Sequence, residues 1–158
     1  MNEELRSQSA DAKADEPCDD CVVDVAKLKE RRQQQAPKEN AWSALILLTR
    51  GTYGHWDDAF SAIQVGNAVL AVEEGATMLL LDDGVYFAVR GQDPSDIGIT
   101  SNTSFIQDFI DLGGRLLALN TSMEKRGLTK QDLMEGVEVV TPTQMAREVA
   151  LHHVSVTF

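Results

Sequence analysis

The chain has 158 residues, of which 43% are hydrophobic, and this is enough for one domain with a buried core. Its formal net charge of -11 excludes a general affinity for nucleic acid or anionic lipid, because both attract basic surfaces. No apolar run reaches the length of a membrane span. The polar, acidic N-terminus lacks the pattern of a signal or transit peptide, so we expect a cytoplasmic protein with reduced thiols.

Residues 1–40 differ in composition from the rest of the chain. They are rich in small, polar and charged residues and contain no aromatic side chain, so they cannot bury enough surface to offset the entropy of ordering them. A helix over 22–35 fits their pattern, although its apolar face is thin. We therefore predict a flexible acidic N-terminal arm over 1–40 and a folded domain over 41–158.

The folded part alternates predicted strands and helices in chain order. Apolar runs predict strands at 44–48, 77–81, 115–119 and 137–140. The last residues of the chain, 154–158, are predicted to form a further strand. Helical spacing and helix-start signals predict helices at 56–74, 105–112, 121–126 and from Pro142, the first of them stopped by Gly75. Residues 85–89 fit either a strand or a short helix. This alternation is typical of an α/β fold with a mostly parallel sheet of about five strands, covered on both faces.

In open α/β sheets, ligands bind beyond the carboxyl ends of the strands. This rule brings three loops to one cleft: residues 49–56, 82–85 and 119–122. The expected cleft residues are Arg50, Thr52, Tyr53, His55, Asp83, Asn120 and Thr121. The first loop contains neither a Walker nor a dinucleotide fingerprint, and no cofactor is predicted.

Two residues, His55 of the expected cleft and the neighbouring Ser122, have competing interpretations. His55 fits a general acid or base, but an exposed histidine in the first turn of a helix explains it with fewer assumptions. Ser122 could be proposed as a nucleophile, but its surroundings lack the nucleophile-elbow pattern. We expect Asn120 or Thr121 to cap the following helix instead.

Cys18 and Cys21 form a CxxC pattern inside the acidic arm. The first interpretation is a pair of reduced thiols on a flexible tail. The second is a link between subunits, in which a second chain completes a four-cysteine zinc site, since one chain supplies only two ligands. The third is a redox or sulfur-carrying pair, which the neighbouring carboxylates disfavour because they oppose a thiolate.

Three stretches, in this order of elements, resemble the DsrE/DsrF-type (TusD-like) sulfur-relay family: 83–85 (Asp-Gly-Val), 126–128 (Arg-Gly-Leu) and 136–139 (Gly-Val-Glu-Val). The resemblance covers about 44–158. It implies a single DsrE-like domain of the flavodoxin type that forms homo-oligomers, commonly trimers or hexamers. In that family a persulfide-carrying cysteine ends the third strand, eight residues before the glycine that matches Gly127. In this chain the position holds Leu119, which cannot carry a sulfane sulfur.

The resemblance therefore implies a protein of sulfur metabolism that binds or scaffolds sulfur-relay proteins without carrying persulfide at the usual position. One alternative is a sulfurtransferase or sulfur carrier that uses Cys18 or Cys21. Another is a small-molecule sensor that uses the strand-end cleft. Whether the chain is an enzyme stays open, and an enzymatic version would be a sulfurtransferase. The scaffold and the sulfur carrier can be distinguished by whether Cys18 or Cys21 accepts sulfane sulfur.

Overall fold

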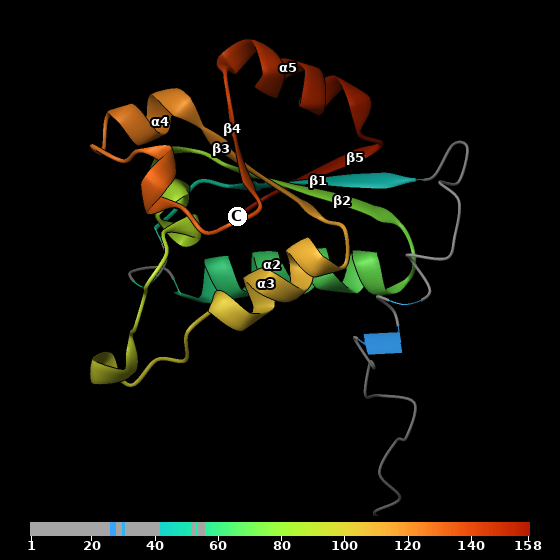
Figure 1. Ribbon diagram of the computed structural model, residues 1–158. Coiled ribbons are helices and arrows are strands. Elements are labelled where there is room, and N and C mark those ends of the chain that lie inside the picture. The colour runs from blue at the N-terminus through green and yellow to red at the C-terminus, as the bar shows by residue number, and fades with distance from the viewer. Residues whose placement is uncertain (1–25, 28–29, 31–41, 52, 54–55) are drawn as a thin grey trace, which may run out of the picture.

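The structure is a computed structural model that describes residues 26–27, 30, 42–51, 53 and 56–158 (Figure 1). Ala26, Lys27 and Glu30 are helical, and the rest of the predicted arm, including both cysteines, lies outside the described residues. Thr52 and His55 also lie outside them. Within the described ranges, no helix combines the length and the apolar character that crossing a bilayer requires.

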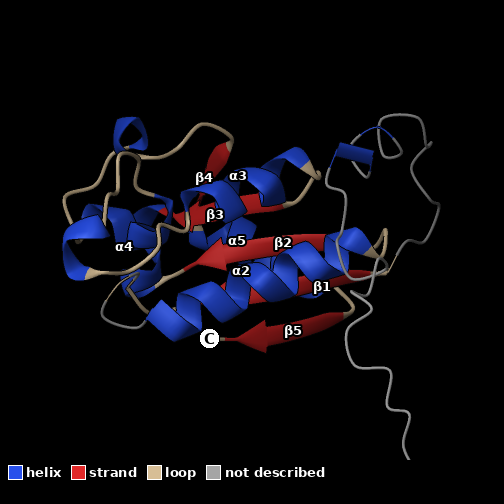
Figure 2. Cartoon of the chain, turned by 90° about the horizontal axis from the view of Figure 1, so that it is seen from below, coloured by secondary structure: helices blue, strands red, loops and turns tan. Residues whose placement is uncertain are grey.

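Five strands form one sheet. They are β1 (Ser43–Leu48), β2 (Gly75–Leu80), β3 (Arg115–Leu119), β4 (Val137–Val140) and β5 (Val154–Thr157). Every neighbouring pair is parallel, and the order β4-β3-β2-β1-β5 makes β4 and β5 the two edges (Figure 2). The predicted α/β fold with a parallel five-stranded sheet is confirmed.

Helices cover both faces of this sheet (Figure 1). On one face lie α2 (Trp56–Ala71) and α3 (Thr103–Asp111), and on the other lie α4 (Asn120–Glu124) and α5 (Pro142–Leu151). Three short 3-10 helices occupy the connections: η2 (Asp82–Ala88), η3 (Ser95–Ile97) and η4 (Lys130–Asp132).

The core follows from the alternation of side chains along each strand. Ile46, Met78 and Leu116 are fully buried against α2 and α3, whereas Leu45 and Leu79 belong to a smaller cluster on the α5 face. That second face is covered thinly, because α5 contributes no buried residue and only its Met145 packs against the cluster.

The aromatic ring of Phe109 connects α3 to both of its neighbours. A Cβ atom on Gly66 of α2 would stand 2.8 Å from this ring, and one on Gly114, just before β3, would stand 2.7 Å from it. Both distances are shorter than real Cβ contacts, so the absence of a side chain at the two glycines makes room for the ring.

Two histidines hold the start of β5 against the far end of the sheet. His153 Nδ1 accepts a hydrogen bond of 3.2 Å from the Ser43 N–H group, and its ring stacks on Trp42. His152 lies 2.9 Å from the hydroxyl of buried Thr77. These contacts join positions about 75 and 110 residues apart.

Two sequence expectations about boundaries are corrected. The helix expected to reach Glu74 ends at Ala71, and Gly75 is the first residue of β2 rather than a helix stop. The chain changes direction between α2 and β2 at Glu73, whose φ of 65° places it in the left-handed region. Residues 85–88, left open between strand and helix, belong to the 3-10 helix η2.

Candidate functional site

The carboxyl end of β2 turns sharply beside the end of β1. Leu81 donates its N–H to the Leu48 carbonyl at 2.9 Å, and Asp82 takes a left-handed conformation with φ 45°. The chain then passes so close to β1 that a Cβ atom on Gly84 would overlap the Leu48 carbonyl oxygen. Only glycine fits this approach, which starts η2 directly at the strand ends and places Asp83 there.

The end of β3 carries Leu119, the position at which the sequence resemblance leads us to expect a cysteine. Leu119 is 8% exposed, is the last residue of the strand and takes the N-cap position of α4. The expectation that Asn120 or Thr121 caps this helix is wrong, because the helix already begins at Asn120. Instead, Asn120 Oδ1 accepts a hydrogen bond of 2.8 Å from the Thr121 N–H group.

Ser122 links the segment after β3 to the segment after β2. Its Oγ accepts a hydrogen bond of 3.0 Å from the N–H group of Asp82, and its side chain is buried. This bond supports the strained backbone of Asp82, since a buried amide without an acceptor would be unfavourable. The hydroxyl has no neighbouring base in the described part of the chain, and its geometry is that of a structural link.

Arg126, just after the end of α4, contacts both η2 and α4. Its Nε and Nη2 atoms lie 2.8 and 2.6 Å from Oδ1 of Asp83, and its Nη1 donates to the Ser122 carbonyl at 3.0 Å. The Arg126 side chain is 18% exposed and that of Asp83 63% exposed. A charge-assisted pair therefore fixes α4 against η2, next to Leu119.

The loop after β1 brings fewer side chains to the strand-end site than the sequence predicts. Arg50 pairs with Asp58 at 3.2 Å, so its charge is committed to the start of α2. Tyr53 interacts with the loop over 91–102: burial raises the pKa of its hydroxyl, Asp93 adds to this effect, and a hydrogen bond to Ser101 opposes it. Gly51 of this loop lies close to Asp83, since an added Cβ would lie 3.6 Å from the Asp83 Cβ.

The structure thus brings Asp83, Asn120 and Thr121 to one end of the sheet and gives Arg50 and Tyr53 other partners. Sequence reasoning did not include Arg126 among the site residues. The Arg-Gly pair that contains it was noticed as a motif, but no local signal points from Arg126 to an aspartate 43 positions away. Across the described ranges, no three histidine, cysteine or acidic side chains converge as a metal site requires.

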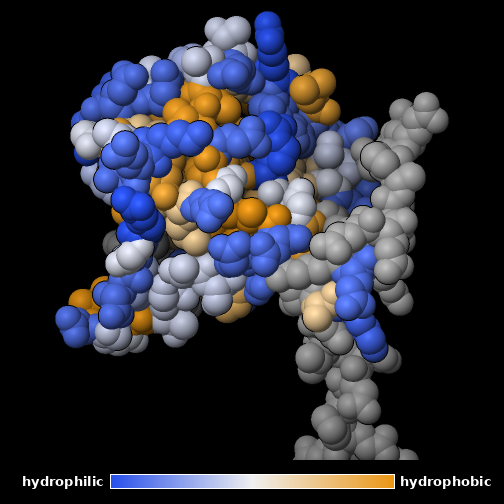
Figure 3. All heavy atoms as spheres, in the orientation of Figure 1, coloured by the Kyte–Doolittle hydropathy of each residue, from blue (hydrophilic) through white to orange (hydrophobic). Residues whose placement is uncertain are grey.

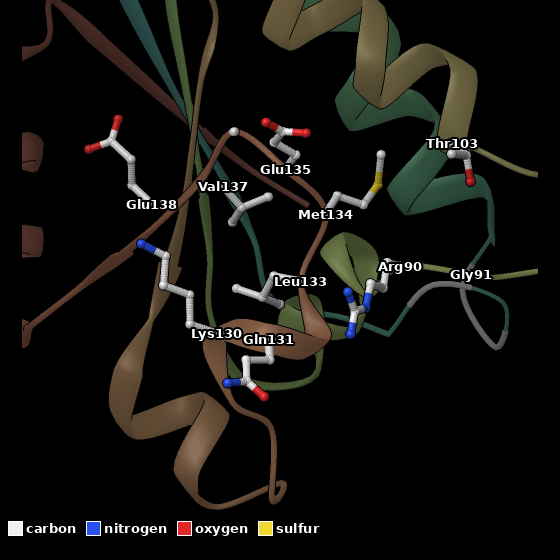
Figure 4. Close-up of a pocket in the computed structure, with 11 residues that line it drawn as sticks. Arg90, Gly91, Thr103, Lys130, Gln131, Leu133, Met134, Glu135, Val137 and Glu138 are labelled. Carbon is white, nitrogen blue, oxygen red and sulfur yellow. The ribbon is translucent and has the colours of Figure 1, made fainter.

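A separate groove of about 740 Å³ runs beside the edge strand β4 (Figure 4). Its apolar lining comes from Leu133, Met134 and Val137, and its polar lining includes Arg90, Lys130, Glu135 and Glu138. Leu133 and Val137 are buried beneath it. The space-filling view shows orange patches bordered by blue ones on the visible face (Figure 3). An apolar floor between charges of both signs suits a polypeptide segment better than a highly charged small molecule.

Comparison with known proteins places these features in a family. Residues 42–158 match the DsrE/DsrF-like family. An uncharacterised protein of Methanocaldococcus jannaschii is 31% identical over 98 residues, which span 61% of this chain and 82% of that protein. The intracellular sulfur oxidation protein DsrF of Allochromatium vinosum is 36% identical over 78 residues, covering 49% of this chain and 57% of that protein.

Two solved structures share the fold. The ychN protein of E. coli superposes with a TM-score of 0.68 at 20% identity, covering 74% of this chain and 99% of that one. A protein of unknown function from Methanobacterium thermoautotrophicum gives a TM-score of 0.57 at 16% identity, with the same coverage of 74% and 99%. At these identities the likeness concerns the fold alone.

Proposed function

Because this chain belongs to the DsrE/DsrF-like family, we propose that it is a cytoplasmic binding or scaffolding partner of a sulfur-relay system. The name of its relative DsrF, an intracellular sulfur oxidation protein, supports a place in sulfur metabolism. Assembly into a trimer or hexamer is part of the proposal. In this role the chain holds relay proteins rather than carrying sulfur on its own strand-end site.

Leu119 carries this proposal. Persulfide chemistry needs a thiolate, and both cysteines of the chain, Cys18 and Cys21, precede the matched residues. At the end of β3 the side chain is apolar and nearly buried, and the adjacent Ser122 hydroxyl is used by the Asp82 amide. The Arg126–Asp83 ion pair links the segment after α4 to η2, so both charges have a partner within the chain.

The groove beside β4 supports a binding role. It offers an apolar floor bordered by charged side chains of both signs beside β4, a combination that suits the side chains of a bound polypeptide segment. Arg90 and Lys130 could pair with acidic groups of the bound segment, and Glu135 with a basic one. Such a surface allows the chain to take part in a relay without a reactive group of its own.

The alternative is a sulfur carrier that works through Cys18 or Cys21. These are the two thiols of the chain, and the CxxC spacing would allow one to resolve a persulfide on the other. In this case the folded domain would recognise partners, and the cysteine-bearing segment would deliver sulfur to them.

One experiment separates the two hypotheses. The full chain and its Cys18→Ser/Cys21→Ser variant are incubated with a low-molecular-weight persulfide, followed by intact mass spectrometry and titration with a cysteine-bearing DsrE/DsrF-type protein. The scaffolding proposal expects no added sulfur on the wild type and equal affinity of both chains for that protein. Sulfur on either cysteine that passes on to the added protein would establish the carrier instead.

A groove variant tests the binding role. Met134→Asp places a charge on the apolar floor and should weaken binding of the relay protein about tenfold or more, which corresponds to about 1.4 kcal/mol. Ile97→Asp is the matched control, because Ile97 is an exposed aliphatic residue outside the groove lining. Equal loss in both variants would remove the groove from the proposal.

A further inference from the structure

Among the described residues, none pairs with the outer edge of β5. β5 ends the strand order, with β1 as its one neighbour. Phe158, directly after β5, donates its N–H to the Leu47 carbonyl at 2.8 Å and accepts from the Thr49 N–H group at 3.0 Å. Because N–H and C=O directions alternate along a strand, Ser155 and Thr157 direct theirs away from β1. They form a row of backbone groups that a further strand can pair with.

This edge lacks the features that normally prevent strand pairing. β5 has the sequence Val-Ser-Val-Thr, without a charged residue, proline or glycine. Natural edge strands are commonly protected by a charge, a proline or a bulge. The opposite edge has such protection: Glu138 of β4 pairs with Arg115 at 3.2 Å, and Arg115 also pairs with Glu148 at 2.9 Å.

Exposed apolar side chains gather around the same edge. Most of the exposed large hydrophobic residues of the described part lie on β5 or on segments beside it: Trp42, Val65, Val72, Leu151, Val154 and Val156. Val154 and Val156 are 39% and 40% exposed, and they share the α2 face because they pair in register with Ala44 and Ile46. A concentration of this kind marks an interaction surface.

Two further valines extend this surface: Val65 of α2 and Val72, directly after the end of α2. They lie seven residues apart, close to two helical turns, so they are on the same side of the helix axis. The opposite flank of α2 faces α3, where Phe60 contacts the ring of Phe105 and Asn67 donates to its carbonyl. Figure 2 shows α3 over the β3 side of the sheet, so the flank of α2 opposite its contacts with α3, which carries Val65, is directed toward the β5 side.

We propose that two copies of this chain pair through β5 in antiparallel orientation, joining their sheets across a two-fold axis. The occupant is a second copy because the strip is uncharged, whereas the chain as a whole carries a net charge of -11. Two like-charged copies repel each other over most of their surface, and an uncharged strip is where they approach at least cost. An antiparallel pair of identical strands is self-complementary, as a two-fold interface requires.

The geometry of this pair is specific. A two-fold axis perpendicular to the sheet keeps the α2 face of both copies on the same side. Val154 and Val156 of the two copies then line the seam, and Val65 of α2 and Val72 directly after it lie at the borders of the seam in each copy. Ser155 and Thr157 supply the main-chain hydrogen bonds across it.

The decisive variant is Ser155→Pro, studied by sedimentation equilibrium of the full chain. Proline removes an N–H group that has no partner within the described chain, so the subunit keeps its fold, but the pairing across the seam is blocked. Wild type should have a mass that is an even multiple of the monomer, which agrees with the hexamer of the proposed function and not with the trimer, and the proline variant should have half of that mass. Ser155→Ala is the matched control, because it retains the N–H group and should retain the wild-type mass.

Val156→Lys provides a second route should the proline variant fail to fold. A lysine in the seam should also halve the mass, whereas Ile97→Lys, on an exposed aliphatic residue away from β5, should leave it unchanged. Hydrogen exchange at the Thr157 amide should be slow in wild type and fast in the lysine variant. A wild type that is monomeric at high micromolar concentration overturns the proposal. An unchanged mass in the folded β5 variants does so too, and would place the contact between copies elsewhere, for example on the N-terminal arm.

Discussion

The carbonyl oxygen of Leu48 occupies the space that a side chain at Gly84 would need. Leu48 ends β1, which pairs with both β2 and β5, and its carbonyl oxygen accepts from the Leu81 N–H group, so this oxygen cannot move without disturbing the sheet. We expect Gly84→Ala to lower the free energy of unfolding by about 3 kcal/mol, at the upper end for overpacking. Denaturant unfolding measures the loss. Gly51→Ala is the control: its nearest contact of 3.6 Å is ordinary, and it should change stability by less than about 0.5 kcal/mol.

The Arg126–Asp83 pair should stabilise the position of α4 more than the fold as a whole. Asp83 is largely exposed, so solvent screens the pair, and Asp83→Asn should cost less than about 1 kcal/mol in unfolding free energy. Arg126→Ala also removes the bond to the Ser122 carbonyl and should cost about 1–2 kcal/mol. Hydrogen exchange in 120–124 should rise in the second variant more than in the first. Equal exchange in the two variants would show that Asp83 is the main contact.

Acid should weaken the turn formed by η4. Hydrogen bonds from the side chain and then the backbone of Thr129, helped by the charge of Arg90, hold the pKa of Asp132 below its ordinary value of 3.8. Because the folded pKa is the lower one, the contribution to stability is complete above the ordinary value and disappears as pH falls through the folded pKa. Asp132→Asn should lack this contribution at neutral pH. Unfolding midpoints measured from neutral pH downward should therefore converge for wild type and variant in acid.

A thiol introduced at the end of β3 tests how accessible that position is. Leu119→Cys, made in the Cys18→Ser/Cys21→Ser background, should be alkylated about tenfold or more slowly in the folded protein than in denaturant, because Leu119 is 8% exposed. The smaller side chain should also lower the unfolding free energy by about 1–2 kcal/mol. Equal alkylation rates with and without denaturant would mean that the strand end is open.

The strands were predictable where sequence alone decides their limits. The run from Arg115 to Leu119 follows two glycines and precedes polar residues, so its apolar length and its ends are both visible locally. The limits of β4 were found for the same reason. Where tertiary contacts decide, the sequence left two possibilities: 85–89 fitted a strand or a short helix, and the 3-10 helix η2 follows from the approach of Gly84 to Leu48, which lies far away in the chain.

The candidate site was predictable in location but not in its contacts. The strand-end rule correctly brought Asp83 and Asn120 to the same end of the sheet. It could not assign Arg126 to Asp83, Ser122 to the Asp82 amide or Tyr53 to the loop of Ser101, because each of these pairs spans dozens of residues. Side-chain partners of this kind depend on loop paths that hydrophobic patterning does not encode.

The hydrogen bond between Ser43 and His153 also bears on how the protein folds. These residues are 110 positions apart, so β1 and β5 close one of the longest loops in the molecule, and pairings of long sequence separation form slowly. Until β5 arrives, β1 presents an apolar, unpaired edge. The time spent in that intermediate, rather than the equilibrium stability of the finished fold, will then decide how much newly made chain is lost to aggregation.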